Sequence, residues 1–208
     1  MEYKIIGDAY PIVECRLKAG EQITCKEGSV AWMTPNMEMM RYNVINGPDS
    51  SRTRLPHLIC TSKGMDGMVS FMTGTYGKVL ALSMEQNGIV AYQKAFLAGS
   101  VGVRSEEIDD KRIWNALSDG KIDDIQLYSG SGDLFFEIIG SPITYELVPG
   151  EVLKTDSDIF VAADQSVGID IVPCREENGT YAATGYEKMQ MKLSGPGKVY
   201  LQTRKSKI

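Results

Sequence analysis

Apolar and polar residues alternate over short stretches of this chain, and glycine-rich turns separate the stretches. From Met189 to Ser194, methionine and leucine alternate with Gln, Lys and Ser, which is the period of a β-strand with one buried face. Four other stretches are more continuously apolar and predict strands buried on both faces: Ile5–Ile6, Ser29–Met33, Lys78–Leu82 and Ile159–Ala163. Strands and turns spaced in this way predict an all-β sandwich, barrel or roll.

One segment follows a different pattern. Between Ser105 and Leu117, acidic residues come first, and Ile113, Ala116 and Leu117 follow at helical spacing, with Gly120 just beyond. Acidic side chains near the N-terminus of a helix and a glycine after its end are favourable features. The sequence therefore predicts one short helix near residues 105–118, packed across the edge of a β layer or serving as a lid or partner surface.

Two motifs recur along the chain. A glycine turn followed by an apolar stretch occurs at Gly130–Gly132 and at Gly195–Gly197, and a looser copy occurs at Gly74–Gly77. A second motif, Leu-x-x-Gly-Glu, ends at Gly20-Glu21 and at Gly150-Glu151, with a degenerate partner that starts at Leu82. We interpret these positions as structural turns rather than as a site of chemistry: Gly20, Glu21, Gly77, Gly130, Gly132, Gly150, Glu151, Gly195 and Gly197.

The spacing of the motifs predicts a threefold internal repeat. The intervals Leu82 to Gly132 and Leu147 to Gly197 are both 50 residues, and Leu17 to Gly77 is 60. Self-similarity at a fixed period indicates one supersecondary unit used several times. The sequence thus predicts a single domain over residues 1–208, built from three β-roll or double-stranded β-helix-like units at about 3–82, 83–147 and 148–203. The surplus of the first unit fits the polar stretch Asn43 to Ser62, which we expect to be a loop, either a tolerated insertion or a binding loop.

Composition narrows the classes of function. The net charge of −5 does not favour a nucleic-acid surface, because binding phosphates requires clustered Lys and Arg. No stretch approaches the ~20 apolar residues of a membrane-spanning helix. Strand-like residues follow Met1 almost at once, so we expect no presequence and a cytoplasmic, bacterial protein. The four cysteines, Cys15, Cys25, Cys60 and Cys174, lack metal-site spacing and are expected to be buried free thiols, although Cys15 and Cys25 could face each other across a hairpin.

Few residues carry recognisable chemistry. The glycine motifs precede β-like stretches rather than a helix, which favours tight turns over a dinucleotide fingerprint, and no P-loop sequence occurs. The one histidine, His57, falls in the expected loop, where it is a surface residue or a lone general base. Asp156 and Asp158 match no calcium loop and are expected to lie in a solvated turn. We therefore assign no catalytic residue, no cofactor and no metal ligand.

Several motifs, taken together in their order, resemble the altered inheritance of mitochondria family, whose bacterial members are a domain of unknown function. They are Leu17–Glu21, Gly28–Met33, Ala95–Ala98, Leu147–Glu151 and Gly195–Thr203. The resemblance implies a triplicated unit similar to that of the tryptophan RNA-binding attenuation protein, and a compact homotrimer with nine units in a ring. It implies no established reaction and no catalytic residues. Arg41–Met72 and Ser105–Leu117 depart from the family pattern.

Three hypotheses follow from these observations. The leading one is a non-catalytic homotrimeric β-scaffold or binding protein that is not an enzyme, with nucleic acid not expected as a partner. The second is an RNA-binding ring, which would need a basic, aromatic-rich groove and would use Arg41, Arg52 and Arg54. The third is a small-ligand-binding protein or enzyme that uses carboxylates at subunit interfaces.

Overall fold

The computed structural model describes residues 1–42, 57–85, 87–108, 125–173 and 189–205 as a chain of β-strands. The all-β prediction is confirmed. In order, the elements are β1 (Glu2–Ile6), β2 (Ile12–Leu17), β3 (Gln22–Lys26), β4 (Val30–Met33), β5 (Met37–Tyr42), β6 (His57–Ser62), β7 (Gly67–Met72), β8 (Gly77–Glu85), β9 (Ile89–Tyr92), η1 (Gln93–Ala95), β10 (Phe96–Ser100), β11 (Val103–Glu107), β12 (Ile125–Ile139), β13 (Pro142–Leu147), β14 (Val152–Asp156), η2 (Ser157–Ile159), β15 (Phe160–Asp164), β16 (Gly168–Pro173), β17 (Met189–Ser194) and β18 (Gly197–Gln202).

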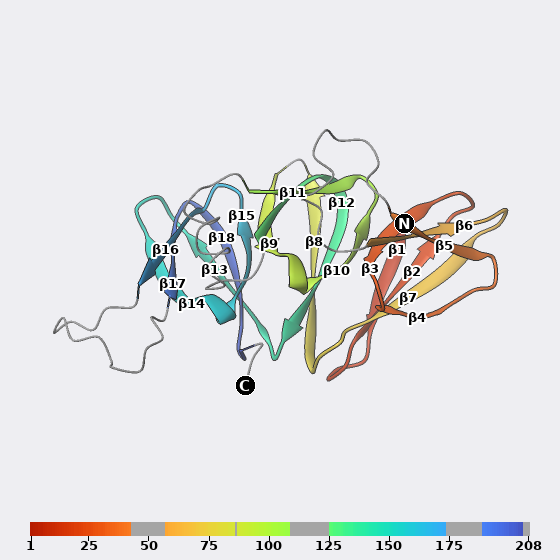
Figure 1. The fold of residues 1–208 in the computed structure, drawn as a ribbon, viewed down its shortest axis with the longest axis horizontal. Helices are drawn as coiled ribbons and strands as arrows, with labels where there is room; N and C mark the ends of the chain where they lie inside the picture. The colour runs from red at the N-terminus through yellow and green to blue at the C-terminus, as the bar shows by residue number, and fades with distance from the viewer. Residues whose placement is uncertain (43–56, 86, 109–124, 174–188, 206–208) are drawn as a thin grey trace.

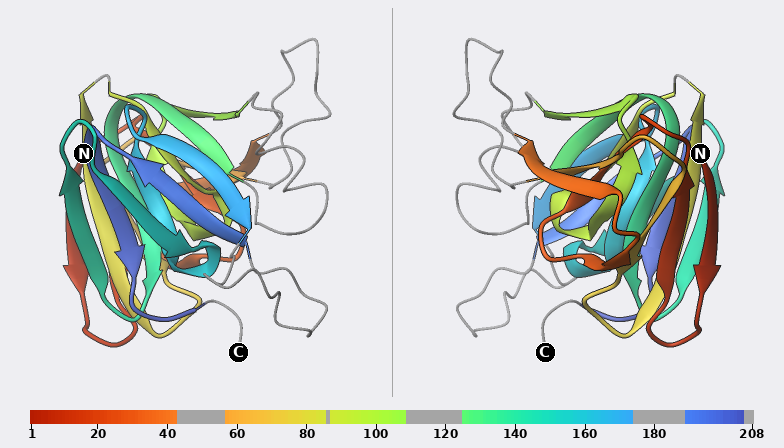
Figure 2. Two further views of the ribbon diagram at one scale, coloured as in Figure 1. Left: turned by 90° about the vertical axis from the view of Figure 1, so that its left-hand side faces the viewer. Right: turned by 90° about the vertical axis from the view of Figure 1, so that its right-hand side faces the viewer.

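All strand pairings are antiparallel, and four of them occur in the same order in three groups of strands. In the first group β7 lies between β2 and β4, and β6 lies between β3 and β5. In the third group β18 lies between β13 and β15, and β17 lies between β14 and β16. In the middle group the long strand β12 fills both central places, pairing with β8 and β10 along one half and with β9 and β11 along the other. The groups follow one another along the long axis of the molecule (Figure 1) and overlap when the molecule is viewed along that axis (Figure 2).

Each group encloses apolar side chains between its two small sheets. In the first group the core lies between β2 and β7 on one side and β3 and β6 on the other, with Val13, Phe71 and Ile23 fully buried. The core continues into the next group through Ala98 and Phe135. A second core joins the middle and third groups, and it includes Tyr92, Phe160 and Met191. The cores therefore extend across the boundaries between groups.

The helix predicted near residues 105–118 is absent from the part of that segment that the structure describes. Ser105–Glu107 belongs to strand β11, which pairs with β12 in a register that places Glu107 opposite Gln126. Local helix preference is weak and tertiary pairing overrides it, which explains the error. Residues 109–117 lie outside the described part of the chain. The prediction of a loop over Asn43–Ser62 is also wrong for its last six residues, because His57–Ser62 forms β6 and pairs with both β3 and β5. Residues 43–56 lie outside the described part of the chain.

Three of the four stretches predicted to be buried on both faces are partly exposed, among them Lys78–Leu82 of β8, whose residues are all half-buried. In β15 the apolar residues Phe160–Ala163 are buried, as predicted. By contrast, Ile5 of β1 is 43% exposed and Trp32 of β4 is 46% exposed. The reason is their place in the sheet, since β1 and β4 are the two outer strands of the order β1-β2-β7-β4. Apolar composition alone does not distinguish such edge strands from central ones.

Candidate functional site

The glycine motif marks a tight crossing in each group. Gly132 and Gly197 have φ of +127° and +138°, where other residues are strained. A Cβ on Gly132 would lie 2.5 Å from the Ser100 Cβ, and one on Gly197 would lie 2.7 Å from the Ser166 Oγ. In the first group the same place belongs to Gly67, where a Cβ would lie 2.6 Å from the Met37 Sδ. A Cβ at any of the three positions would therefore crowd a neighbouring side chain.

The residue after each of these glycines is held in the same way. The backbone N–H of Met68 donates to Thr34 Oγ1 at 3.1 Å, that of Asp133 to Ser100 Oγ at 3.0 Å, and that of Lys198 to Asp164 Oδ2 at 2.8 Å. The acceptors stand just after β4 and at the ends of β10 and β15, the equivalent strands of the three groups. The three glycines thus fix the last strand of each group against an equivalent neighbour.

The sequence motifs do not identify Gly67 as the first copy of the glycine turn, and they assign that place to Gly77 instead. Gly77 begins β8, which pairs with β12 as β2 pairs with β7 and β13 with β18. Gly77 therefore corresponds to the start of the first strand of a group, not to the motif that precedes the last one. The signal that identifies Gly67 is its spacing, because Gly67, Gly132 and Gly197 are 65 residues apart, and Leu17 to Gly67 is again 50 residues. The first unit was assigned ten more residues than the others only because the interval from Leu17 was measured to Gly77 instead of Gly67.

The other predicted turn residues lie beside the same strands. Gly20 and Gly150 have φ of +84° and +90°. Next to them, Glu21 Oε2 accepts the Lys18 N–H at 2.7 Å, and Glu151 Oε2 accepts the Val148 N–H at 2.9 Å. Two more predicted turn glycines sit against backbone carbonyls, Gly130 against Gly102 O and Gly195 against Val148 O.

The three groups are joined edge to edge by two equivalent strand pairings. Strand β10 of the middle group pairs with β3 of the first, with Ala98 opposite Cys25. Strand β15 of the third group pairs with β9 of the middle one, with Ala162 opposite Ala91. All four of these side chains are fully buried. We call these pairings the internal joins.

A polar latch accompanies each internal join. At the first, Lys26 Nζ donates to Glu137 Oε1 at 2.6 Å and to the Lys94 carbonyl at 3.1 Å, while Glu137 Oε2 accepts the Gly74 N–H at 2.9 Å. At the second internal join, the single side chain of Gln202 makes both the donor and the acceptor contact. Its Nε2 donates to the Asp158 carbonyl at 2.8 Å, and its Oε1 accepts the Ile139 N–H at 3.1 Å. Glu137 and Gln202 are 65 residues apart.

The strands that form the internal joins have counterparts in the first and third groups, namely β4 and β14. Among the described strands, β4 pairs only with β7, and β14 pairs only with β17, so each keeps one open edge. Large apolar side chains are exposed on these strands. Trp32 is 46% exposed, Met33 37% and Val152 50%. An open apolar edge is an interaction surface that folded proteins usually cover.

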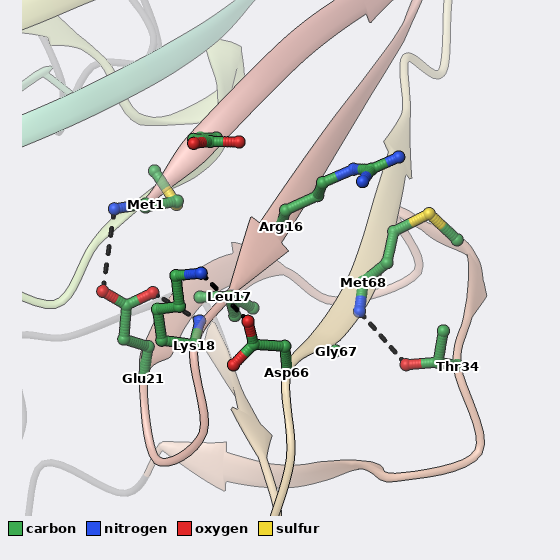
Figure 3. Close-up of a pocket in the computed structure, with 10 residues that line it drawn as sticks. Met1, Arg16, Leu17, Lys18, Glu21, Thr34, Asp66, Gly67 and Met68 are labelled. Carbon is green, nitrogen blue, oxygen red and sulfur yellow. Dashed lines mark hydrogen bonds and ion pairs between the residues drawn. The ribbon is translucent and has the colours of Figure 1, made fainter.

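A hollow of about 500 Å³ lies at the end of the first sheet, between the start of the chain and the turn after β2. Figure 3 shows two pairs of oppositely charged groups that face each other there. The Met1 ammonium lies 3.6 Å from Glu21 Oε1, and Lys18 Nζ lies 3.0 Å from Asp66 Oδ2. The Lys18 ammonium and the Ala19 N–H hold the pKa of the Asp66 carboxyl below its ordinary value. The carboxylates of Glu21 and Asp66 thus make contacts within the chain.

Other candidate groups are dispersed or buried. Cys15, Cys25 and Cys60 are buried free thiols, as predicted, and Cys174 is not described. Cys15 and Cys25 do not face each other across a hairpin, because β2 pairs with β7 and β3 with β6; instead Cys25 Sγ lies 4.0 Å from Cys60 Sγ. His57 lies in β6 and not in a loop. Asp156 accepts the Asp158 N–H at the start of η2, which is a turn role. A search of the described residues finds no group of three or more potential metal ligands.

Edge-joined groups of antiparallel strands define this chain as an all-β protein. The family model Mitochondrial biogenesis AIM24 matches residues 3–204, and the chain belongs to that family. The resemblance seen in the sequence motifs is therefore confirmed.

Comparison with solved structures supports the same fold. The crystal structure of protein SPYM3_0169 from Streptococcus pyogenes is similar, with a TM-score of 0.80 and 20% identity over 98% of this chain and 94% of that one. At this identity the likeness shows the fold alone. A comparison with curated proteins gave no significant match. In the described part of the chain, no helix is long and apolar enough to span a membrane.

Proposed function

We infer that this protein is a non-catalytic scaffold or binding protein whose working form is a homotrimer. The observation that carries the proposal is the pair of internal joins, which leave β4 and β14 with open edges at the two ends of the described chain. A chain that ends in two complementary edges associates head to tail, and such heterologous contacts form a ring when the rotation closes. Three copies of a three-unit chain give the nine-unit ring that the family resemblance implies.

The chemistry of the described residues is consistent with a scaffold. The buried polar side chains of the latches fix strands to one another, and two carboxylates in the hollow near Met1, Glu21 and Asp66, pair with cations of the same chain. General acid–base catalysis needs a group free to exchange a proton with a substrate. Glu21 and Asp66 are already bound in this hollow, which favours a structural role for it.

The mass in solution tests this proposal. Size-exclusion chromatography with light scattering should give three times the 22.9 kDa of one chain, independent of concentration over the micromolar range. A mass of one chain would contradict the trimer. A series of masses that grows with concentration would indicate an open filament and would contradict ring closure.

RNA binding and small-ligand binding stay as alternatives. Arg41, one of the three arginines on which RNA binding depends, forms an ion pair with Glu27 at 2.9 Å, and Arg52 and Arg54 are not described. Titration of a labelled RNA at low salt tests the first alternative, because electrostatic binding is strongest there. A thermal-shift screen of metabolites tests the second, since a ligand of the folded state raises the melting temperature.

A further inference from the structure

We propose that β4 of one copy pairs antiparallel with β14 of the next, with Trp32 opposite Thr155 and Met33 opposite Lys154. The proposal rests on the self-assembly inferred above and goes beyond it by naming the strands, the register and the side chains at the contact. Its template is the pair of internal joins, which use the corresponding strands of the chain itself.

The position of β4 in this contact follows from a bulge shared by the three equivalent strands. The pairing of β4 with β7 shifts between Val30 and Trp32, that of β10 with β12 between Phe96 and Ala98, and that of β15 with β18 between Phe160 and Ala162. The partners before the shift, Phe71, Phe136 and Leu201, are 65 residues apart. Trp32 therefore corresponds to Ala98 and Ala162, the residues that begin the two internal joins.

The position of β14 follows from the turns that precede β3 and β14. Both strands begin one residue after the glutamate that caps its turn, Glu21 or Glu151. Thr24 then corresponds to Lys154, and Cys25 to Thr155. Burial supports this alignment, because Cys25 is fully buried and Thr155 is 8% exposed. In the first internal join Ala98 lies opposite Cys25 and Gly99 opposite Thr24, so the same register places Trp32 opposite Thr155 and Met33 opposite Lys154.

The side chains at the proposed contact fit a partner of this kind. Ala98 and Ala162 are fully buried, whereas Trp32 in the same place is 46% exposed in the single chain. Trp32 thus occupies a position that is a core position in both internal joins, and pairing with β14 would remove it from water. A ring of this kind also leaves no open edge on either strand, which removes a template for aggregation.

The contact must form between copies. Strands β4 and β14 lie at opposite ends of the long axis of the molecule (Figure 1). A disulfide between a residue of β4 and one of β14 therefore links two chains and is visible as a change of mass on a denaturing gel.

Cysteine cross-linking tests the register. The double variant Met33→Cys/Lys154→Cys places thiols at directly opposite positions, where Cα atoms are about 4.5–5.5 Å apart and a disulfide can form. The matched control Met33→Cys/Val152→Cys moves one thiol two residues along the same face, about 7 Å further, which is out of reach. Each single-cysteine variant is a control for disulfides formed with the native Cys174. The replaced side chains are exposed, so the variants should fold like the wild type.

After mild oxidation, the first double variant should lose its monomer band on a non-reducing gel in favour of linked dimers and trimers, while the control and the single variants stay monomeric on the gel. Light scattering of the reduced variants separates the two proposals. A trimer whose cross-link fails at Lys154, or forms instead at Val152, overturns the register but leaves the assembly intact. A monomeric mass overturns both.

Discussion

The ammonium of Lys26 donates to the carboxylate of Glu137 at 2.6 Å across the first internal join, and the Glu137 side chain is only 10% exposed. The second internal join uses Gln202 in the place of Glu137 and needs no cation, because the amide of Gln202 itself supplies the donor. The ion pair is thus one of two chemical solutions to the same contact, and the difference between them can be measured.

Replacing the cation should destabilise the fold, and neutralising the anion should restore it. Lys26→Met leaves the Glu137 carboxylate buried without its cation, and removing one partner of a buried pair costs about 3 kcal/mol, the lower end of the usual range because Lys26 is one-third exposed. Adding Glu137→Gln removes the buried charge and supplies a donor for the Lys94 carbonyl. Urea unfolding at fixed protein concentration measures both free energies.

The matched control for this pair is an exposed one. Lys63 and Glu38 lie 3.2 Å apart with both side chains more than half exposed, so Lys63→Met should cost less than about 1 kcal/mol. If Lys26→Met costs no more than Lys63→Met, the latch does not stabilise the join.

Alanine at Gly132 should cost more than alanine at Gly150. Both glycines have positive φ, which costs other residues about 1–2 kcal/mol. A Cβ on Gly150 meets nothing within 4 Å, whereas one on Gly132 would lie 2.5 Å from the Ser100 Cβ. Gly150→Ala should therefore lower the melting temperature only through the backbone strain. Gly132→Ala should lower it further, because the steric clash with Ser100 adds to that strain. Equal shifts would mean that Ser100 moves away freely.

Stability should fall in mild alkali. Burial raises the pKa of the Cys15 thiol to about 12, and burial also raises the pKa of Tyr128. Below pH ~8.5 both states hold the thiol proton, so its contribution to stability is fully present. Above that pH the unfolded chain loses this proton first, and stability is lost with a slope approaching about 1.4 kcal/mol per pH unit for each thiol until the folded pKa is reached.

Unfolding by urea between pH 7 and 10.5, under reducing conditions, measures that slope for the wild type and for Cys15→Ala. The variant should be less stable at neutral pH because of the cavity, but its stability should decline less steeply with pH. Parallel curves would show that Cys15 ionises equally in both states.

Charge at Trp32 should prevent assembly. Trp32→Arg places a cation where the internal joins bury alanine, and a buried unpaired charge is expensive. We expect its mass by light scattering to fall to that of one chain. Met65→Arg, which changes a side chain that is 65% exposed and outside the proposed contact, should leave the trimer intact. A trimeric Trp32→Arg variant would place the subunit contact elsewhere.

The sequence reveals strands where burial alternates or is complete, as at Met189–Ser194 and Phe160–Ala163, because these patterns depend on local periodicity. The phase of the repeat is harder to read. Gly64-Met-Asp-Gly67 resembles Gly74-Thr-Tyr-Gly77 in spacing, and only strand pairing shows that Gly67 is the equivalent of Gly132. The open edge of β4 was also hidden, since Trp32 reads as a core residue in the sequence although its side chain is 46% exposed. Edges depend on pairing between distant segments, which composition does not encode.

Strand β12 runs for 15 residues through Gly130 and Gly132 without a break, whereas the other two groups divide the same path into β6 and β7 and into β17 and β18. One continuous backbone therefore ties both small sheets of the middle group together, and their relative angle is set by a single strand. In the outer groups a turn separates the corresponding strands, so no single strand sets the angle between their two sheets. We therefore expect the middle group to be the most rigid of the three, and the outer groups to provide the adjustments of curvature that closure of the proposed ring would require.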